Sequence, residues 1–408
     1  MKTAGILTIG NDILQGYTLD LNANTISAEL TKRSINVTVH LSVPDSVSKI
    51  AEKIDKFIQK DYDYVFVTGG LGPTHDDVTK KALLELFDSK LIFLEDRHKE
   101  LEQKYLNKSK NKNIDKSQSE ILSNSTPIDN HVGTALGMII KENKTEVIIL
   151  PGVPNEMEQM LLSYLKQENF QIAKNHIVTI NTAGIYESKV SKKIQHIVDE
   201  YSSDFSFSYL PNYEGVKIRI TSLNSDKNNI QAPQKKIMNS LSEYVYGLDN
   251  VKLEEVLSKL IINNELKLSL AESCTGGFIA KSITDIAGSS SYFLGSIVAY
   301  DNAIKESILG VPSELIKEFG AVSRQVSESM AINVSEKFKS NIAISCTGIS
   351  GPSGGTDEKP VGTVYISVKC MDKIITKKFI FKLGREFHRI ITKQTALYML
   401  WKLLKEKI

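Results

Sequence analysis

Residues 64–83 read YVFVTGGLGPTHDDVTKKAL, and this stretch decides the fold of the first 165 residues. The run YVFVT is almost continuously apolar, as in a parallel strand that helices cover on both faces. Two glycines then permit a tight turn, and two carboxylates lead into a helical segment. The stretch therefore predicts one strand–turn–helix unit of an α/β fold.

The same pattern recurs on both sides of this stretch. AGILTIG (4–10) and EVIILPG (146–152) are further apolar strands, each followed by a helical segment. A helix is also expected between the first strands, because apolar residues recur there at helical spacing: Val47, Ile50, Ile54, Phe57 and Ile58. This alternation predicts a doubly wound α/β domain over residues 1–168.

Two further domains are expected. Residues 172–248 change in character and predict a small α+β unit with antiparallel strands. Residues 252–408 predict a third, α/β domain that opens on an amphipathic helix. Segment 107–119 is rich in lysine and asparagine, so we expect an exposed loop there rather than a basic binding patch. A hairpin or connecting turn is expected at residues 224–229.

The composition narrows the class of protein. Of the 408 residues 41% are hydrophobic and 24% charged, which is typical of a soluble globular protein, and the formal net charge is only +2. A near-neutral chain is not expected to bind nucleic acid directly. No apolar run is long enough to span a membrane, and no signal peptide is recognisable. Three cysteines without a CxxC pair favour a reducing cytoplasm.

LAESCTGGFIAK, residues 270–281, places three possible nucleophiles before two glycines. The segment predicts a strand, a tight turn and a helix, so Ser273 would stand at the carboxyl edge of a sheet, where such folds bind ligands. A nucleophile and a helix cap are equally good interpretations of Ser273 and Thr275. No histidine lies between His196 and His388, so a serine nucleophile needs another base, such as a desolvated lysine.

A lysine and a glycine-rich loop complete this second constellation. Lys305 follows Tyr300 in VAYDNAIKESILG, although a lysine in a helix is most often solvated. SCTGISGPSGGTDEKPVGTVY, residues 345–365, crowds seven glycines and prolines between two strands. Such a loop leaves backbone N–H groups free to surround an anion, and its length favours a functional loop over a simple hairpin.

These motifs resemble the nicotinamide-nucleotide amidase domain at the C-terminus of CinA proteins. AESCTGG, GSSSYFLGSIVAYDNAIKESILGV, GAVS and CTGISGPSGGTDEKPVGTVYI occur in the family order within residues 252–408. The resemblance implies hydrolysis of nicotinamide mononucleotide to nicotinate mononucleotide and ammonia. It also implies Ser273 as nucleophile and Lys305 as base. The other implied catalytic residues are Tyr300 and Thr347.

Several residues are expected to bind the substrate of this amidase. Arg385 stands where the family has a substrate-binding arginine, although Arg389 lies nearby. The 5′-phosphate is expected at Gly288, Ser289 and Ser290, because glycine loops and helix ends accommodate phosphate. The remaining expected contacts are the glycines of the two turns: Gly276, Gly277, Gly348, Gly351 and Gly354. This route requires no metal, and Cys274 is expected to pack rather than react.

The opening stretch also predicts a site. Asp76 and Asp77 are candidate ligands of a divalent cation at a bound phosphate, and the alternative is that one of them caps the next helix. The segment resembles the MoaB/MogA-like molybdopterin-binding domain, with supporting matches at IGNDILQGYTLDLNAN, VPD, NHVGTALGM and LPGVPNEM. The residues that match the family site, or fall in its motifs, are Asp12, Asp45, Gly69, Gly70, Gly72, Asp77 and Glu156.

In CinA proteins this domain is associated with an ADP-ribose pyrophosphatase that depends on a metal such as cobalt or magnesium. Two departures weaken the match: Asp12 replaces the usual glutamate, and GTALG replaces GTAPG at residues 133–137. The middle domain resembles the KH-like linker of the family but has no GxxG loop, so a spacer or dimerisation role is expected. The alternatives to a two-activity, homodimeric enzyme are a competence- or DNA-damage-related interaction protein and a nucleotide- or pterin-binding module without turnover.

Overall fold

The computed structural model describes residues 2–106, 114–171, 177–223 and 229–407. The chain divides into two compact units, Met1–His176 and Ile177–Ile408. Each unit is described by itself. Residues 107–113 of the lysine-rich segment and residues 224–228 of the expected turn lie outside the described residues.

The first unit contains a six-stranded sheet of order β2-β1-β3-β8-β7-β6. Strands β2, β1, β3 and β8 are parallel; β7 runs antiparallel to β8, and the edge strand β6 runs antiparallel to β7. The strands are β1 (Thr3–Ile9), β2 (Asn36–Val43), β3 (Tyr64–Thr68), β6 (Ser125–Ile128), β7 (Gly137–Glu142) and β8 (Thr145–Leu150), with a separate pair β4 (Leu91–Phe93) and β5 (Glu120–Leu122). The helices are α1 (Asn11–Leu14), α2 (Leu21–Thr31), α3 (Val47–Gln59), α4 (Thr79–Phe87), α5 (Glu95–Leu106), the short 3₁₀ helix η1 (Lys116–Ser119) and α6 (Pro154–Gln167).

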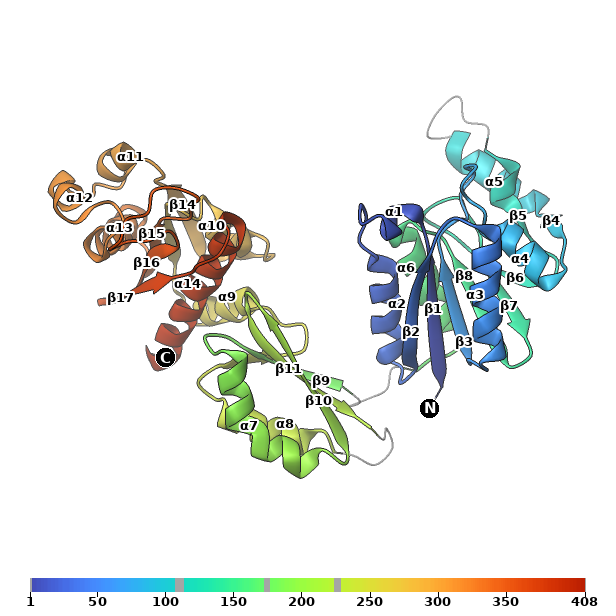
Figure 1. Cartoon of the computed structure of the whole chain (residues 1–408). Helices are drawn as coiled ribbons and strands as arrows, with labels where there is room; N and C mark the ends of the chain where they lie inside the picture. Colours follow the sequence, from blue (N-terminus) through green and yellow to red (C-terminus); the bar gives the residue numbers. More distant parts are fainter. Residues whose placement is uncertain (1, 107–113, 172–176, 224–228, 408) are drawn as a thin grey trace. The chain divides into compact units, whose positions relative to one another are not determined.

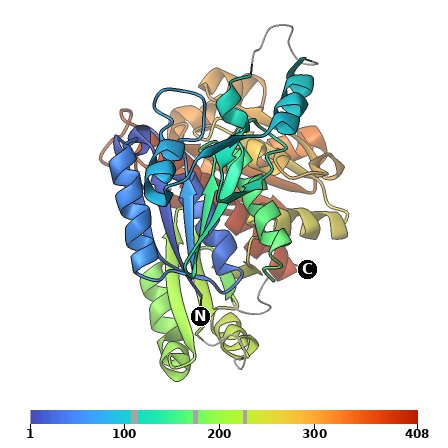
Figure 2. The ribbon, with the colours of Figure 1, turned by 90° about the vertical axis from the view of Figure 1, so that its right-hand side faces the viewer.

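Helices cover both faces of this sheet (Figure 1). Ile26 of α2 and Leu161 of α6 belong to one buried cluster with alternate residues of β1, β3 and β8. Ile54 of α3 and Leu83 of α4 belong to a second cluster with the other residues of the same strands. Figure 2 shows the same ribbon after a 90° turn about the vertical axis, with α3 (blue) at its left margin. The strand YVFVT is buried at every residue because both faces are covered. The predicted doubly wound arrangement is confirmed.

The second unit begins with a small antiparallel sheet of order β10-β11-β9-β12, on which α7 and α8 pack. Its elements are β9 (Ile177–Thr182), α7 (Glu187–Tyr201), β10 (Phe205–Asn212), β11 (Gly215–Ser222), α8 (Gln231–Ser240) and β12 (Val245–Leu248). The antiparallel α+β character expected for this segment is confirmed.

The rest of the second unit forms a five-stranded sheet of order β14-β13-β15-β16-β17, parallel across β14, β13 and β15 and antiparallel beyond. One face packs on α9, α10 and α14, and the other on α13. The strands are β13 (Leu268–Glu272), β14 (Phe293–Val298), β15 (Ile342–Gly348), β16 (Thr363–Cys370) and β17 (Lys373–Ile380). The helices are α9 (Leu253–Asn263), α10 (Phe278–Thr284), the 3₁₀ helix η2 (Ser289–Ser291), α11 (Asn302–Ser307), α12 (Ser313–Phe319), α13 (Arg324–Phe338) and α14 (Arg385–Lys407).

Within the described ranges, every helix is too short or too polar to cross a membrane.

Candidate functional site

The carboxyl ends of β13, β14 and β15 lie at one edge of the second unit's large sheet, because these strands run parallel. A cavity of about 320 Å³ opens there. It is lined by eight of the residues singled out in the sequence: Ser273, Tyr300, Lys305, Thr347, Gly348, Gly351, Gly354 and Arg385. They come from the turn after β13, the segment from β14 into α11, the end of β15 with the loop that follows it, and the start of α14, so the site exists only in the folded chain.

Ser273 stands in the tight turn between β13 and α10. Gly276 and Gly277 have φ values of 59° and 88°, a left-handed conformation that glycine adopts without strain. Ser273 is 7% exposed and lines the cavity, whereas the two glycines do not line it. The helix-cap interpretation of Ser273 and Thr275 is wrong, because the N-cap residue of α10 is Gly277, and Glu272 rather than either hydroxyl accepts from N–H groups in the first turn. Thr275 is fully buried and donates its hydroxyl to Glu272 instead.

Lys305 is the most unusual side chain of the cavity, because a lysine is only 2% exposed there. Its Nζ donates to the carbonyl of Tyr300 at 3.2 Å and to Oδ1 of Asn302 at 3.5 Å. Burial lowers the pKa of Lys305, and the charge of Asp301 opposes this only in part. The ordinary interpretation, a solvated helical lysine, is therefore wrong. A neutral amine is available more readily at this position than at the protein surface.

Cys274 lines the same cavity, but its thiol is poorly suited to attack. A hydrogen bond with Cys346, together with burial, raises the pKa of Cys274 well above its usual value. The thiolate is the reactive form of cysteine, so a raised pKa makes the thiol inert at neutral pH. All three cysteines are free and buried.

Arg385 also lines the cavity and makes two hydrogen bonds there. One guanidinium nitrogen donates to the Tyr300 hydroxyl at 2.6 Å, and another donates to the carbonyl of Gly351 at 3.0 Å. Thr347 donates its hydroxyl to the carbonyl of Ala321 at 2.8 Å, which leaves its oxygen lone pairs free to accept. Arg389 does not line the cavity, so Arg385 is the better placed of the two arginines to contact a ligand there.

The structure does not bring Gly288, Ser289 and Ser290 to the cavity. They lie at η2, ahead of β14, and none of them lines it. Ser353 and Gly354 of the glycine-rich loop line it instead, together with Arg385.

Sequence reasoning missed a serine–histidine pair beside this cavity. Ser350 lines it and lies 3.0 Å, Oγ to Nδ1, from His388, which is fully buried. The other imidazole nitrogen lies 3.2 Å from the carbonyl of Gly362, so Nε2 carries the proton and Nδ1 accepts from Ser350. Burial lowers the pKa of His388 and favours this neutral form. The two residues are 38 positions apart in the sequence, so no local pattern reveals the pair; the fold brings α14 next to the glycine-rich loop.

The first unit has a cavity of about 280 Å³ at the carboxyl ends of β1 and β3. Six predicted residues line it: Asp12, Asp45, Gly69, Gly70, Asp76 and Asp77. Gly72 and Glu156 do not line it, and Glu156 accepts a hydrogen bond from Asn130 instead. Gly69 allows the close approach of two strands, since a Cβ there would lie 2.4 Å from the carbonyl oxygen of Ile9.

Both carboxylate oxygens of Asp77 are hydrogen-bonded within its own loop. Its Oδ1 accepts from the N–H of Gly72 at 2.8 Å, and Oδ2 accepts from the N–H of Thr74 at 2.9 Å and from the Thr74 hydroxyl. The alternative that Asp76 or Asp77 caps the following helix is also wrong, because α4 starts after Val78 without a side-chain cap. No cluster of three His, Cys, Asp or Glu residues that could hold a metal occurs among the described residues. The residues present therefore do not fit a protein-built cation site.

Two buried polar side chains of this cavity were not predicted. Asn22 is 6% exposed and donates to the Thr68 hydroxyl and to the Gly152 carbonyl, at 2.9 and 2.8 Å. Its Oδ1, and the hydroxyl of Thr8, have no hydrogen-bond partner in the described part of the chain. Asn22 lies in the quoted stretch LDLNAN, but a helix pattern alone does not reveal which polar residue faces inward.

Three family models match the chain: "CinA C-terminal domain" at residues 250–404, "Probable molybdopterin binding domain" at 5–169 and "Damage-inducible protein CinA KH domain" at 178–247. A "Putative competence-damage inducible protein" of Halothermothrix orenii is 36% identical over 414 residues, covering 98% of each chain. A "CinA-like protein" of Amoebophilus asiaticus is 36% identical over 418 residues, covering 99% of this chain and 98% of the relative. The crystal structure of competence/damage inducible protein CihA from Agrobacterium tumefaciens is 40% identical, covers 38% of this chain and 97% of that one, and has a TM-score of 0.36.

Proposed function

The chain belongs to the CinA family, and from this premise we propose that its C-terminal domain hydrolyses nicotinamide mononucleotide to nicotinate mononucleotide and ammonia. One observation carries the proposal: a serine in a tight turn and a desolvated lysine line the same cavity. A serine–lysine pair is a known solution for acyl transfer without a catalytic histidine.

In the proposed route, neutral Lys305 takes the proton of Ser273 while the serine oxygen attacks the carboxamide carbon. The resulting oxyanion is held by N–H groups of the turn after Ser273. The N–H of Ser273 itself does not take part, because it donates to the carbonyl of Cys346. The lysine ammonium then gives its proton to the leaving nitrogen, and ammonia departs. Water, deprotonated by Lys305, attacks the acyl-enzyme and releases the nicotinate product with regeneration of Ser273.

We propose that the glycine-rich loop, rather than residues 288–290, binds the phosphate. Gly354, Ser353 and Arg385 line the cavity, and Arg385 supplies a positive charge beside backbone N–H groups. A guanidinium next to a glycine loop is well suited to a phosphate. No metal takes part in this route.

The proposal is tested by measuring ammonia release from nicotinamide mononucleotide by the full chain and three variants. We expect Ser273→Ala to abolish release and Cys274→Ala to retain it. Ser350→Ala separates the two hydroxyls of the cavity, and we expect substantial activity to remain. Activity in Ser273→Ala together with its loss in Ser350→Ala would transfer the nucleophile to the serine–histidine pair and contradict the proposal.

For the N-terminal domain we propose nucleotide binding with ADP-ribose pyrophosphatase activity. Support comes from the family model matched there and from a cavity that carries Asp12, Asp45 and Asp76 beside a glycine turn. No step is derived through a cation. ADP-ribose hydrolysis with added cobalt or magnesium tests the proposal, and a protein that deamidates without hydrolysing ADP-ribose would contradict it.

The names of relatives favour a second candidate function, that of an interaction protein related to competence or damage. A purified chain that releases no ammonia and hydrolyses no ADP-ribose would favour this candidate over an enzyme. We further propose a cytoplasmic homodimer, which light scattering of the purified protein would test.

A further inference from the structure

The turn that carries Ser273 is fixed at Thr275 from two sides. The Thr275 hydroxyl donates to Oε2 of Glu272 at 2.7 Å. The Thr275 carbonyl oxygen accepts from two nitrogens of Arg389, Nε at 3.1 Å and Nη2 at 2.8 Å. Ser273 lies two residues earlier, and the N–H of Gly276 donates to its carbonyl at 3.0 Å. The position of the Ser273 side chain therefore depends on how firmly Thr275 is held.

Glu272 is a carboxylate inside the core. It is fully buried, yet no basic side chain lies within ion-pair distance of it in the described part of the structure. Its oxygens accept instead from the Thr275 hydroxyl, from the N–H groups of Ile279 and Ala280 at 3.1 and 2.8 Å, and from the Ser296 hydroxyl at 3.4 Å. A buried charge is stable only when hydrogen-bonded in this way, so Glu272 ties the start of α10 to the end of β13.

Arg389 holds the same turn from the face of α14. Its guanidinium lies over the Phe278 ring, 5.7 Å from the centroid, and points two N–H groups at one carbonyl oxygen. Arg385, one helical turn earlier on α14, reaches the cavity itself through Tyr300 and Gly351. The two arginines of one helix face thus contact different parts of the site.

We propose that Glu272 and Arg389 are positioning residues that hold Thr275 between them and thereby set the Ser273 hydroxyl at the cavity. The identity of the substrate in the test below rests on the proposed deamidase function, but the placement of Ser273 does not. Neither residue touches the cavity, so both act through the turn. A misplacement of about 1 Å at a reacting atom costs on the order of 100-fold in rate.

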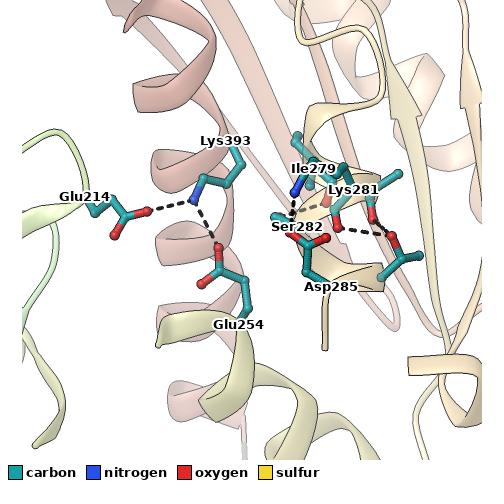
Figure 3. Close-up of polar contacts among 9 residues, drawn as sticks. Glu214, Glu254, Ile279, Lys281, Ser282, Asp285 and Lys393 are labelled. Carbon is teal, nitrogen blue, oxygen red and sulfur yellow. Dashed lines mark hydrogen bonds and ion pairs between the residues drawn. The ribbon is translucent and has the colours of Figure 1, made fainter. Parts of the chain in front are cut away.

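Three variants perturb the turn without emptying the core. In Glu272→Gln, one oxygen still accepts from Thr275 and Ile279, but the amide nitrogen faces the N–H of Ala280, so two donors oppose each other. Arg389→Lys keeps the charge and loses the planar fork, and Arg389→Met loses both. The matched control is Lys281→Met, because Lys281 pairs with Asp285 on the exposed side of α10 (Figure 3).

Two readouts are needed. The first is kcat and KM for ammonia release from nicotinamide mononucleotide by the full chain. The second is the rate at which a fluorophosphonate labels Ser273, followed by mass spectrometry. We expect Glu272→Gln and Arg389→Met to lower kcat and labelling by roughly 10- to 100-fold, with KM within about twofold of wild type. Arg389→Lys should recover part of the loss, and Lys281→Met should match wild type.

Unchanged kcat and labelling in Arg389→Met would overturn the proposal, as would a loss confined to KM. Should Glu272→Gln fail to fold by circular dichroism, the ranking of wild type, Arg389→Lys and Arg389→Met still decides. A wild-type chain that labels at Ser273 but releases no ammonia would contradict the deamidase function alone. The labelling rates of the variants would then decide whether Glu272 and Arg389 position Ser273. A chain that neither labels nor releases ammonia would overturn both.

Discussion

Lys393→Met should weaken two contacts of α14, one with α9 and one with the domain that contains the small antiparallel sheet. Lys393 of α14 is 4% exposed, and its Nζ lies 3.0 Å from Oε1 of Glu254 in α9 and 3.2 Å from Oε1 of Glu214 in the β10–β11 turn (Figure 3). The Glu254 side chain is only 10% exposed, whereas that of Glu214 is 49% exposed. The two ion pairs therefore differ in strength although their lengths are similar.

The burial of each carboxylate sets how much free energy of unfolding is lost when its ion pair is removed. Removing one partner of a buried ion pair leaves an uncompensated charge and costs about 3–5 kcal/mol, and we take the lower end because Glu254 keeps some contact with water. Glu214→Gln should cost less than about 1 kcal/mol, since water already screens that carboxylate. Lys393→Met combined with Glu254→Met should recover most of the loss, because apolar side chains often replace a buried ion pair at little cost.

Hydrogen–deuterium exchange of peptides from α9 and α14 measures these differences in the folded chain. A loss of about 3 kcal/mol corresponds to exchange that is roughly 100-fold faster in Lys393→Met, and Glu214→Gln should stay within about fivefold of wild type. Exchange in Lys393→Met that rises less than about fivefold would refute the argument from burial. Failure of the double variant to recover protection would show that Lys393 acts through its packing, for instance on the Phe278 ring 6.0 Å away, rather than through Glu254.

Four further predictions concern the two cavities. Burial lowers the pKa of Lys305, so the unfolded state binds its proton more readily than the folded state. The stability attributable to this group therefore rises with pH between the lowered pKa and the ordinary lysine pKa of 10.5. Lys305→Met should abolish deamidation yet raise Tm at pH 7, and an unchanged or lower Tm would count against a desolvated lysine. The same shift predicts that kcat/KM of wild type rises with pH and levels off below 10.5, which a pH–rate profile checks. Asp77→Ala removes the acceptor of Gly72 and Thr74, so ADP-ribose binding by calorimetry should weaken by at least about tenfold while ammonia release is unchanged; equal affinity would refute the structural role of Asp77. Gly69→Ala should lower Tm far more than Gly16→Ala, because φ is positive at both glycines (109° and 77°) but only Gly69 would place a Cβ against a backbone oxygen; similar thermal shifts would contradict this.

Much of the fold could be predicted from local patterns. YVFVT and EVIIL are apolar at nearly every position, and such runs are stable only as strands covered on both faces. Glycines after β3 and β13 indicated tight turns, and parallel strands bring the residues that follow them to one edge. On this ground Ser273 could be expected at such an edge, whereas Lys305, Thr347 and Arg385 were expected to join it only because of the family resemblance.

Other features required the tertiary structure. Spacing could not show that Lys305 is buried, because burial depends on which loops close over α11. Thr275 precedes a helix and is of a residue type that often caps helices. Its hydroxyl instead donates to Glu272, and its carbonyl accepts from Arg389. Residues 288–290 have the composition of a phosphate site, yet η2 holds them away from the cavity.

The sequence by itself determined the layered α/β architecture and the residue types available at the carboxyl edges of the strands, because apolar periodicity and turn chemistry are local properties. Only the tertiary structure decided which polar groups are desolvated and which are already bonded. His388 illustrates the difference, because the distant helix α14 brings it to Ser350. Protonation and reactivity depend on such long-range partners, and no local pattern specifies them.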